Sequence, residues 1–235
     1  MAETGAGIPP KDIFVIVPAH NEGEVLAATL KPLLQASYSV VVVDDGSKDG
    51  TWQILAKMPV YALRHPVNLG QGAALQTGMT FALRKGARFL AHFDADGQHR
   101  PQDIAALLEP VANGEADVAL GSRFLRSLDE REVPLGRRII LKTAIVVNAL
   151  LTGLWLSDAH NGLRVLSREA AAQIHLRENG YAHASEIMIQ IRHLKLRIAE
   201  RPVRVHYSRY TRAKGQSLWN AFNIVIDLLL RRVFK

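Results

Sequence analysis

The residues best suited to chemistry are concentrated in the run His92-Phe93-Asp94-Ala95-Asp96-Gly97-Gln98-His99. Asp94 and Asp96 stand two residues apart at the end of an apolar segment, and Gln98 adds an amide oxygen. Oxygen ligands of this kind suit Mg²⁺ or Mn²⁺, hard cations that in turn bridge substrate phosphates. The pattern therefore predicts a divalent metal site. The alternative, since the pattern is short, is that the two aspartates form a turn or cap a following helix.

Two other polar runs also follow apolar segments. One is Val43-Asp44-Asp45-Gly46-Ser47-Lys48-Asp49-Gly50-Thr51, and the other is Pro18-Ala19-His20-Asn21-Glu22. A carboxylate at the end of a strand in a parallel sheet can accept hydrogen bonds from a base or from ribose hydroxyls. The alternative for the first run is a loop whose Asp49 or Thr51 caps a helix. The second run alone indicates little.

The elements that must position these runs alternate between strand and helix in the first half of the chain. Strands are expected at 12–18, 39–43, 60–64, 88–93 and 117–120. A first helix is expected to end near residue 35, and further helices are expected at 51–57, 71–85 and 101–112. Strands that are apolar throughout indicate an α/β fold with a mostly parallel sheet and helices on both faces. Ligands bind at the carboxyl ends of such strands, where the acidic runs stand.

The second half of the chain is less regular. A charged loop is expected at 125–134, a helix at 136–154, strands at 163–166 and 197–206, and helices from about 168 and 184. The chain is expected to divide into a flexible N-terminus at 1–11, one main domain at 12–215 and an amphipathic C-terminal helix at 216–235.

Composition narrows the class of protein. The 235 residues suffice for one sizeable core. The absence of cysteine excludes disulfides, thiolate zinc sites and cysteine nucleophiles. A net charge of +7 favours an anionic partner: nucleic acid, a phosphate-bearing substrate or acidic lipid. No signal peptide is recognised before Ile13, and Lys142 and Asn148 argue against a membrane span in the longest apolar run, 139–156.

Taken together, the motifs resemble glycosyltransferase family 2. The three polar runs occur in that family's order, with Asn68-Leu69-Gly70-Gln71-Gly72-Ala73-Ala74 between the second and the metal-binding run. Three later motifs are similar to the branch that contains dolichol-phosphate mannose synthases and polyprenyl-phosphate glycosyltransferases. They are Gly121-Ser122-Arg123, Asp158-Ala159-His160-Asn161-Gly162-Leu163-Arg164 and Arg212-Ala213-Lys214-Gly215-Gln216-Ser217. The resemblance extends from about Ile13 to Ser217.

The resemblance implies a nucleotide-diphospho-sugar transferase fold of the GT-A type and inverting sugar transfer to a polyprenyl phosphate. By motif, Asp94, Asp96 and Gln98 would hold the metal. The catalytic and phosphate-contacting residues would be Asp96, Arg123, Arg138 and Arg212. The nucleotide-sugar pocket would be lined by Pro18, Asn21, Glu22, Asp44, Asp45, Gly70, Asp94, Ala95 and Lys214.

The chemistry is consistent with these roles. Splitting a sugar–diphosphate bond leaves negative charge on the departing nucleotide, which a divalent cation and arginines stabilise. A phosphate acceptor has a second pKa of about 6 and is mostly ionised at pH 7, so it needs no general base. A sugar hydroxyl as acceptor would need one, and Asp158 or Glu186 would then be the candidates. A third alternative is a non-catalytic partner that binds nucleotide sugars.

The expected partners are a GDP- or UDP-sugar, a polyprenyl phosphate and a membrane surface. The broad apolar face and basic end of 216–235, together with 139–156, predict peripheral docking on the cytoplasmic face of the membrane. A dimer contact or docking on the protein's own core is the alternative, and a homo-oligomer is compatible with the sequence. No nucleic-acid module is present, and Leu75 in place of a third glycine disfavours a dinucleotide site at Gly70. Leu218 departs from the branch, which often has lysine there.

Overall fold

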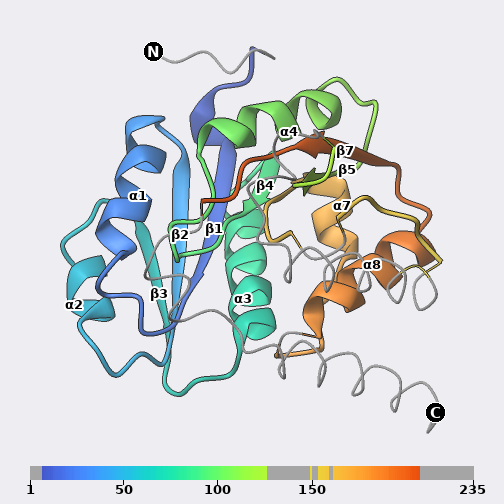
Figure 1. Ribbon diagram of the computed structural model, residues 1–235. Coiled ribbons are helices and arrows are strands. Elements are labelled where there is room, and N and C mark those ends of the chain that lie inside the picture. Colours follow the sequence, from blue (N-terminus) through green and yellow to red (C-terminus); the bar gives the residue numbers. More distant parts are fainter. Residues whose placement is uncertain (1–6, 126–148, 150–152, 159–160, 181, 207–235) are drawn as a thin grey trace, which may run out of the picture.

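The computed structural model describes residues 7–125, 149, 153–158, 161–180 and 182–206 (Figure 1). Within these residues seven strands form one sheet in the order β3-β2-β1-β4-β6-β5-β7. The strands are β1 (Ile13–Ala19), β2 (Ser39–Asp45), β3 (Tyr61–His65), β4 (Phe89–His92), β5 (Val118–Ser122), β6 (Arg164–Ser167) and β7 (Ile198–Pro202). The helices are α1 (Leu26–Gln35), α2 (Thr51–Leu55), α3 (Gln71–Arg84), α4 (Gln102–Ala112), α7 (Arg168–Gln173) and α8 (His183–His193), with a 3₁₀ turn at Pro10–Asp12.

Helices cover both faces of the sheet, as the apolar strands predict. Alternate residues of β1 point to opposite faces. Val15 and Val17 belong to one apolar cluster with residues of α1, α2 and α4. Phe14 and Ile16 belong to another, with residues of α3, α7 and α8. The α/β architecture expected from the sequence is therefore confirmed.

The sheet is mostly parallel, with one reversed strand. Strands β3, β2, β1 and β4 run parallel to one another. Strand β6 runs antiparallel to both of its neighbours, β4 and β5, while β5 pairs in parallel with β7. Because β6 is reversed, its first residue lies opposite the last residue of β4, with Arg164 paired to His92. The start of β6 and the carboxyl ends of its neighbours thus share one edge of the sheet.

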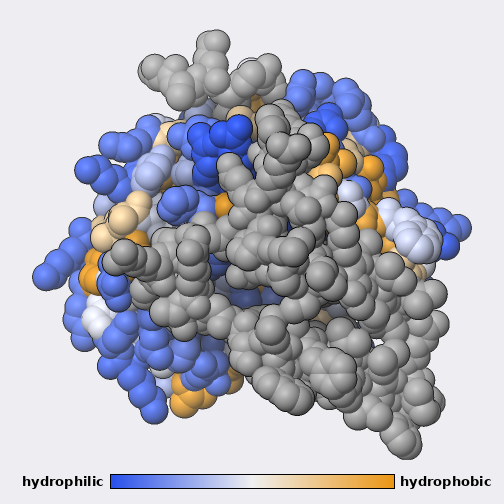
Figure 2. Space-filling model, viewed as in Figure 1, coloured by the Kyte–Doolittle hydropathy of each residue, from blue (hydrophilic) through white to orange (hydrophobic). Residues whose placement is uncertain are grey.

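Within the described residues, no helix combines the length and apolar character needed to cross a membrane. The helix expected at 136–154 and the C-terminal helix expected at 216–235 lie wholly or almost wholly outside the described residues. The part of the surface coloured in Figure 2 is mainly hydrophilic, with separate hydrophobic areas.

Candidate active site

Asp94 lies just beyond β4, at the edge where β4 ends and β6 begins. Its Oδ2 accepts a hydrogen bond from His99 Nε2 at 2.9 Å, and its Oδ1 accepts one from Gln71 Nε2 at 3.2 Å. A Cβ atom placed on Gly162 would lie 2.3 Å from Oδ2, so the backbone before β6 fits closely against the carboxylate. Helix α3, the 93–99 loop and the chain entering β6 therefore meet at this one side chain.

The electrostatic setting favours the ionised form of Asp94. Burial would raise the pKa of its carboxyl, but the hydrogen bond from His99 and the positive charge of Arg164 outweigh burial and lower it. Asp96 behaves in the opposite way, because burial and the charge of Asp94 raise its pKa. The pKa values of these two neighbouring carboxyl groups are thus shifted in opposite directions, and the groups repel each other when both are ionised. A bound cation would reduce that repulsion.

Asp96 and Gln98 form a local pair. Gln98 donates to Asp96 from its backbone N–H at 3.0 Å and also from its side-chain amide. Thr29 Oγ1 on α1 donates to the carbonyl of Ala95 at 3.2 Å, so the loop is tied to the helix beside it. The predicted ligands Asp96 and Gln98 are thus brought together, and the buried methyl of Ala95 packs into the core.

These residues fit a divalent cation that also uses ligands from its substrate. Within the described part of the chain, no three histidine or acidic side chains form a group that could hold a metal ion. Two carboxylates and an amide oxygen are instead a partial oxygen set. Mg²⁺ is commonly held in this way, by one or two carboxylates with substrate phosphates and water completing its shell.

The neighbouring carboxylate on β2, Asp44, has an acceptor without a hydrogen bond. Asp44 is fully buried, and its Oδ1 accepts from the backbone N–H of Ser47 at 3.0 Å. Its Oδ2 has no hydrogen-bond donor among the described residues, although Arg64 Nε lies 3.1 Å away as an ion-pair partner. The Arg64 guanidinium in turn lies 5.2 Å from the centre of the Trp52 ring. A buried carboxylate oxygen that has an ion-pair partner but no hydrogen-bond donor can accept a hydrogen bond from a ligand N–H.

Asp45, the residue after Asp44, accepts hydrogen bonds from within the protein on both of its oxygens. Its Oδ1 accepts from His65 Nδ1 at 2.7 Å and from the backbone N–H of Leu69 at 2.9 Å. Its Oδ2 accepts from the backbone N–H of Gly70 at 2.7 Å. Both oxygens therefore hold the loop that leads into α3, and the carboxylate acts inside the protein.

Gly70 occupies a position that no other residue suits. Its φ is +104°, and an added Cβ would lie 2.2 Å from the carbonyl oxygen of Asn179. Two residues later, Gly72 donates its N–H to the same oxygen at 2.7 Å. The turn into α3 is thus enclosed by Asp45 on one side and by the 178–180 backbone on the other.

The first polar run joins the second through Asn21, whose φ is +54°. Its backbone N–H donates to Ser47 Oγ at 2.9 Å, and its Oδ1 accepts from the N–H of Lys48 at 2.9 Å. The N–H of Glu22 donates to Thr51 Oγ1 at 3.0 Å. Pro18, the last residue but one of β1, is paired with Val43 of β2. The loop after β1, which carries Asn21 and Glu22, is therefore hydrogen-bonded to the loop after β2.

Arg123, at the end of β5, forms a buried ion pair that motif reading alone did not indicate. Its Nε lies 2.6 Å from Asp158 Oδ2, and its Nη2 lies 2.7 Å from Oδ1. The backbone N–H of Arg123 also donates to Asp158 at 3.1 Å. Of the other expected cationic contacts, Arg138, Arg212 and Lys214 lie outside the described residues.

A buried basic cluster lies beneath the site, on the face of the sheet covered by α3 and α8. Arg164 is 3% exposed and pairs in register with His92, while His183 lies on α8. Burial lowers the pKa of Arg164 to about 10, of His92 to about 3 and of His183 to about 4. At neutral pH the two histidines are uncharged, and Arg164 remains the charged member.

Sequence reasoning assigned no role to this cluster, to His99 or to Gly162. Residues 162 and 164 stand in a motif that was recognised, and His99 ends the 92–99 run in which the metal ligands were expected. The register of an antiparallel strand, which the sequence does not display, was needed to place Arg164 beside His92.

Comparison with known proteins gives matches over most of the chain. The family described as "Glycosyl transferase family 2" matches residues 14–174. A UDP-N-acetylglucosamine–dolichyl-phosphate N-acetylglucosaminyltransferase of Methanococcus voltae is 31% identical over 245 aligned residues, covering 96% of this chain and 98% of that protein. A polyprenol monophosphomannose synthase of Mycolicibacterium smegmatis is 34% identical over 188 residues, covering 74% of this chain and 71% of that protein.

A solved structure is also similar. It is glucosyl-3-phosphoglycerate synthase from Mycobacterium tuberculosis in complex with Mn²⁺, UDP and phosphoglyceric acid. The TM-score is 0.70 with 21% sequence identity, over 94% of this chain and 78% of that one. At this level of identity the likeness concerns the fold.

Proposed function

The chain belongs to glycosyltransferase family 2, and from that premise we propose that it transfers a sugar from a nucleotide diphosphate to a polyprenyl phosphate. The chain is a glycosyltransferase with the GT-A fold. The acceptor class is supported by the two relatives, whose names specify dolichyl phosphate and a polyprenol monophosphate product. Both alignments cover more than two thirds of each protein.

The observation that carries the choice of acceptor is that both candidate bases are already engaged. Asp158 pairs with Arg123 through three hydrogen bonds. Glu186 accepts from the backbone N–H groups of Arg177 and Glu178 at distances of 2.9–3.0 Å. A hydroxyl acceptor needs a base to remove its proton, whereas a phosphate at pH 7 is already an anion. The arrangement therefore favours a phosphate.

In the proposed reaction an oxygen of the acceptor phosphate bonds to the anomeric carbon of the sugar. The bond from that carbon to the diphosphate breaks, and its electron pair leaves with the nucleoside diphosphate. A single displacement of this kind inverts the anomeric configuration. No protein nucleophile takes part, and no proton has to move.

Asp94, Asp96 and Gln98 would hold Mg²⁺ or Mn²⁺ beside the diphosphate. When bound, a divalent cation stabilises the negative charge that develops on the departing nucleotide. The opposed pKa shifts of the two aspartates support this assignment, because a cation would remove the repulsion between them. Arg123, oriented by Asp158, would contact phosphate oxygens at the end of β5, with Arg138, Arg212 and Lys214 as further expected contacts.

For the nucleoside, Asp44 is the strongest proposed contact. Its Oδ2 is a buried carboxylate oxygen without a hydrogen-bond donor among the described residues. Such an oxygen can accept a hydrogen bond from an N–H group of the nucleobase. Pro18 at the end of β1, with Asn21 and Glu22 on the loop after it, would line the same pocket. Asp45 and Gly70 would shape the pocket by fixing the turn into α3.

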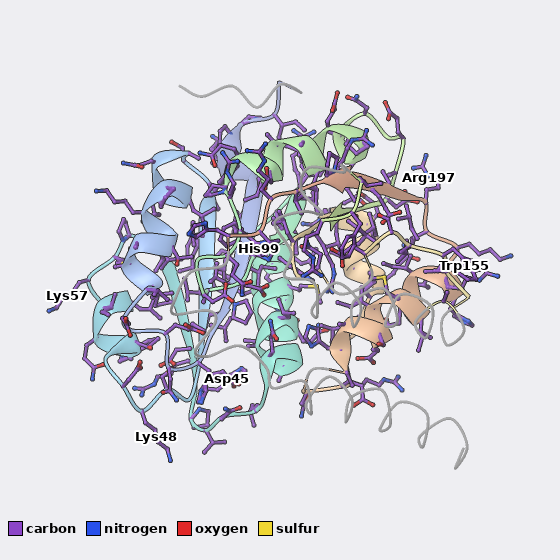
Figure 3. All side chains as sticks on the ribbon, in the orientation of Figure 1. Asp45, Lys48, Lys57, His99, Trp155 and Arg197 are labelled. Atoms are coloured by element: carbon purple, nitrogen blue, oxygen red, sulfur yellow. The ribbon has the colours of Figure 1, made fainter. Side chains whose placement is uncertain are left out.

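We also propose peripheral docking on the membrane that carries the acceptor, at its cytoplasmic face. The net charge of +7 favours acidic lipid. Trp155, from the apolar run expected to dock, is 75% exposed and lies at the margin of the molecule in Figure 3. Flotation with anionic liposomes tests the proposal, and protein that stays at the bottom of the gradient would contradict it.

The decisive assay combines the protein, Mn²⁺, radiolabelled UDP- or GDP-sugars and polyprenyl phosphate. Label extractable into organic solvent is the expected result. Label in a water-soluble glycan would instead identify a hydroxyl acceptor, and donor binding without turnover would identify a binding protein. Asp96→Ala is expected to abolish transfer while the circular dichroism spectrum stays native. Transfer by metal-depleted Asp96→Ala at the wild-type rate would refute the metal role.

A further inference from the structure

The carboxylate of Asp94 is confined on several sides before any ligand binds. His99 Nε2 contacts Oδ2 at 2.9 Å, and Gln71 Nε2 contacts Oδ1 at 3.2 Å. The absence of a side chain at Gly162 leaves just enough room for Oδ2. A hydrogen bond on each oxygen, together with a backbone wall, restricts the rotation of a short side chain.

Of these contacts, the one from His99 is the most firmly held. The His99 side chain is 4% exposed, and its ring packs edge-on against Phe93 with 5.7 Å between the ring centres. His99 therefore cannot turn away from Asp94 without disturbing the core. By contrast, the longer bond from Gln71 comes from a flexible and only partly buried side chain.

The direction of the hydrogen bond between His99 and Asp94 follows from the chemistry of the two groups. Its Nδ1 is buried and has no hydrogen-bond partner within the described chain. In a neutral imidazole one nitrogen carries the proton, and the other is an acceptor. Because a carboxylate can only accept, the proton belongs on Nε2, which donates to Asp94 Oδ2. His99 is thus a fixed donor aimed at one oxygen of a proposed metal ligand.

We propose that His99 is a positioning residue that fixes the Asp94 carboxylate in the orientation in which it binds the divalent cation. This inference rests on the metal site put forward above. Mg²⁺ and Mn²⁺ are bound best by oxygen atoms already held in place, since Mg²⁺ in particular demands near-ideal octahedral geometry. Partners that orient a metal ligand typically change metal affinity about ten- to a hundredfold when they are removed. His99 acts through Asp94 and does not itself bind the ion.

A matched set of variants tests this role. His99→Phe keeps an aromatic ring against Phe93 but removes the donor, whereas His99→Gln retains an N–H donor. His193→Phe, at an exposed histidine on α8, is the control. Mn²⁺ binding is measured from the free-ion electron paramagnetic resonance signal, with UDP in one series and GDP in another.

The expected result is an increase of about tenfold or more in the Mn²⁺ dissociation constant for His99→Phe. His99→Gln should stay within about threefold of wild type, and His193→Phe should match it. Equal Mn²⁺ affinity in His99→Phe and wild type would overturn the inference. If the circular dichroism spectrum of His99→Phe is not native, His99→Leu replaces it as the variant without a donor.

Two further outcomes separate this inference from the function it rests on. If the wild-type protein fails to bind Mn²⁺ both in the presence of UDP and in the presence of GDP, the proposed metal site itself is wrong. If electron-spin-echo spectra of bound Mn²⁺ show coupling to a histidine nitrogen that His99→Gln abolishes, His99 is a ligand and the positioning role is wrong. The expected spectrum has no such coupling.

Discussion

Asp158 holds the guanidinium of Arg123 with both of its carboxylate oxygens: Nε lies 2.6 Å from Oδ2 and Nη2 lies 2.7 Å from Oδ1. The pair is almost fully buried, since the side chains are 8% and 1% exposed. Asp158 therefore determines where the positive charge at the end of β5 stands.

Removing that carboxylate should destabilise the protein. Asp158→Ala is expected to lower the free energy of unfolding by about 3–5 kcal/mol, because a buried guanidinium loses its charged partner. The exposed pair of Arg197 and Asp117 provides the control, and Asp117→Ala should have a far smaller effect. Urea titrations measure both, and equal losses would contradict the structural role given to burial.

The same residue separates the two acceptor classes by activity. Asp158→Asn keeps the shape of the side chain but cannot act as a base. If Asp158 only orients Arg123, the variant should lower kcat and leave the pH profile of kcat/KM unchanged. Loss of the limb that rises with pH would instead show that Asp158 removes a proton from a hydroxyl acceptor.

The buried histidines predict how stability depends on pH. The pKa of His92 is about 3 and that of His183 about 4 in the folded protein, against an ordinary value of 6.5. Between pH 6.5 and 4 the unfolded chain binds more protons than the folded one, so the free energy of unfolding falls as the pH falls. His92→Met should reduce this slope, since methionine fills a similar volume and does not titrate.

The control for that prediction is His193→Met, at an exposed position on α8. It should leave the slope of stability against pH as in wild type. Chemical denaturation at several pH values gives the slopes directly. If His92→Met and wild type show the same slope, His92 is not the buried neutral group described above.

The enclosed turn into α3 can be tested with a pair of glycines. Gly70 and Gly86 both have positive φ, +104° and +86°, but only at Gly70 would a Cβ meet other atoms. Gly86→Ala should cost about 1–2 kcal/mol from the backbone conformation alone. Gly70→Ala should cost more, by about 1–3 kcal/mol for displacing Asn179. Stability is measured by thermal and urea unfolding. If both variants lose the same stability, the 178–180 backbone moves to accommodate the added Cβ at no measurable cost.

Adjacent carboxylates on β2 are expected to have different effects. Asp44→Asn should weaken binding of UDP or GDP by about ten- to a hundredfold, because it removes a charged acceptor for the base. Asp45→Asn should mainly lower stability, since both oxygens of Asp45 hold His65 and the loop before α3. Calorimetry with each nucleotide and Mn²⁺ measures affinity. The reverse pattern, with affinity lost at Asp45 and kept at Asp44, would exchange their assigned roles.

Much of the fold was predictable because its signals are local. Apolar strands such as 39–43 can be buried on both faces only in a sheet covered on both sides, and β2 is placed accordingly. The proposed metal ligands Asp94, Asp96 and Gln98 form a local signal too, since they stand within five residues of one another.

What could not be predicted depends on contacts between distant residues. Asp44 and Asp45 are adjacent and of one type, yet their hydrogen bonds differ. Among the described residues Asp44 Oδ2 has no hydrogen-bond donor, whereas both oxygens of Asp45 accept from backbone N–H groups. The partners Arg123 and Asp158 are 35 residues apart. The predicted domain limits and the roles of Arg138, Arg212 and Lys214 stay predictions.

The reversed direction of β6 has a consequence for how such enzymes can diversify. The chain leaves β5 at Ser122 and re-enters the sheet at Arg164, and both residues lie at the edge that bears Asp94. Both ends of the segment that joins these two residues are therefore fixed at the edge of the sheet that bears Asp94. Insertions, deletions or new side chains there can alter which acceptor is admitted, while the strand pairings that hold the donor-binding half stay as they are.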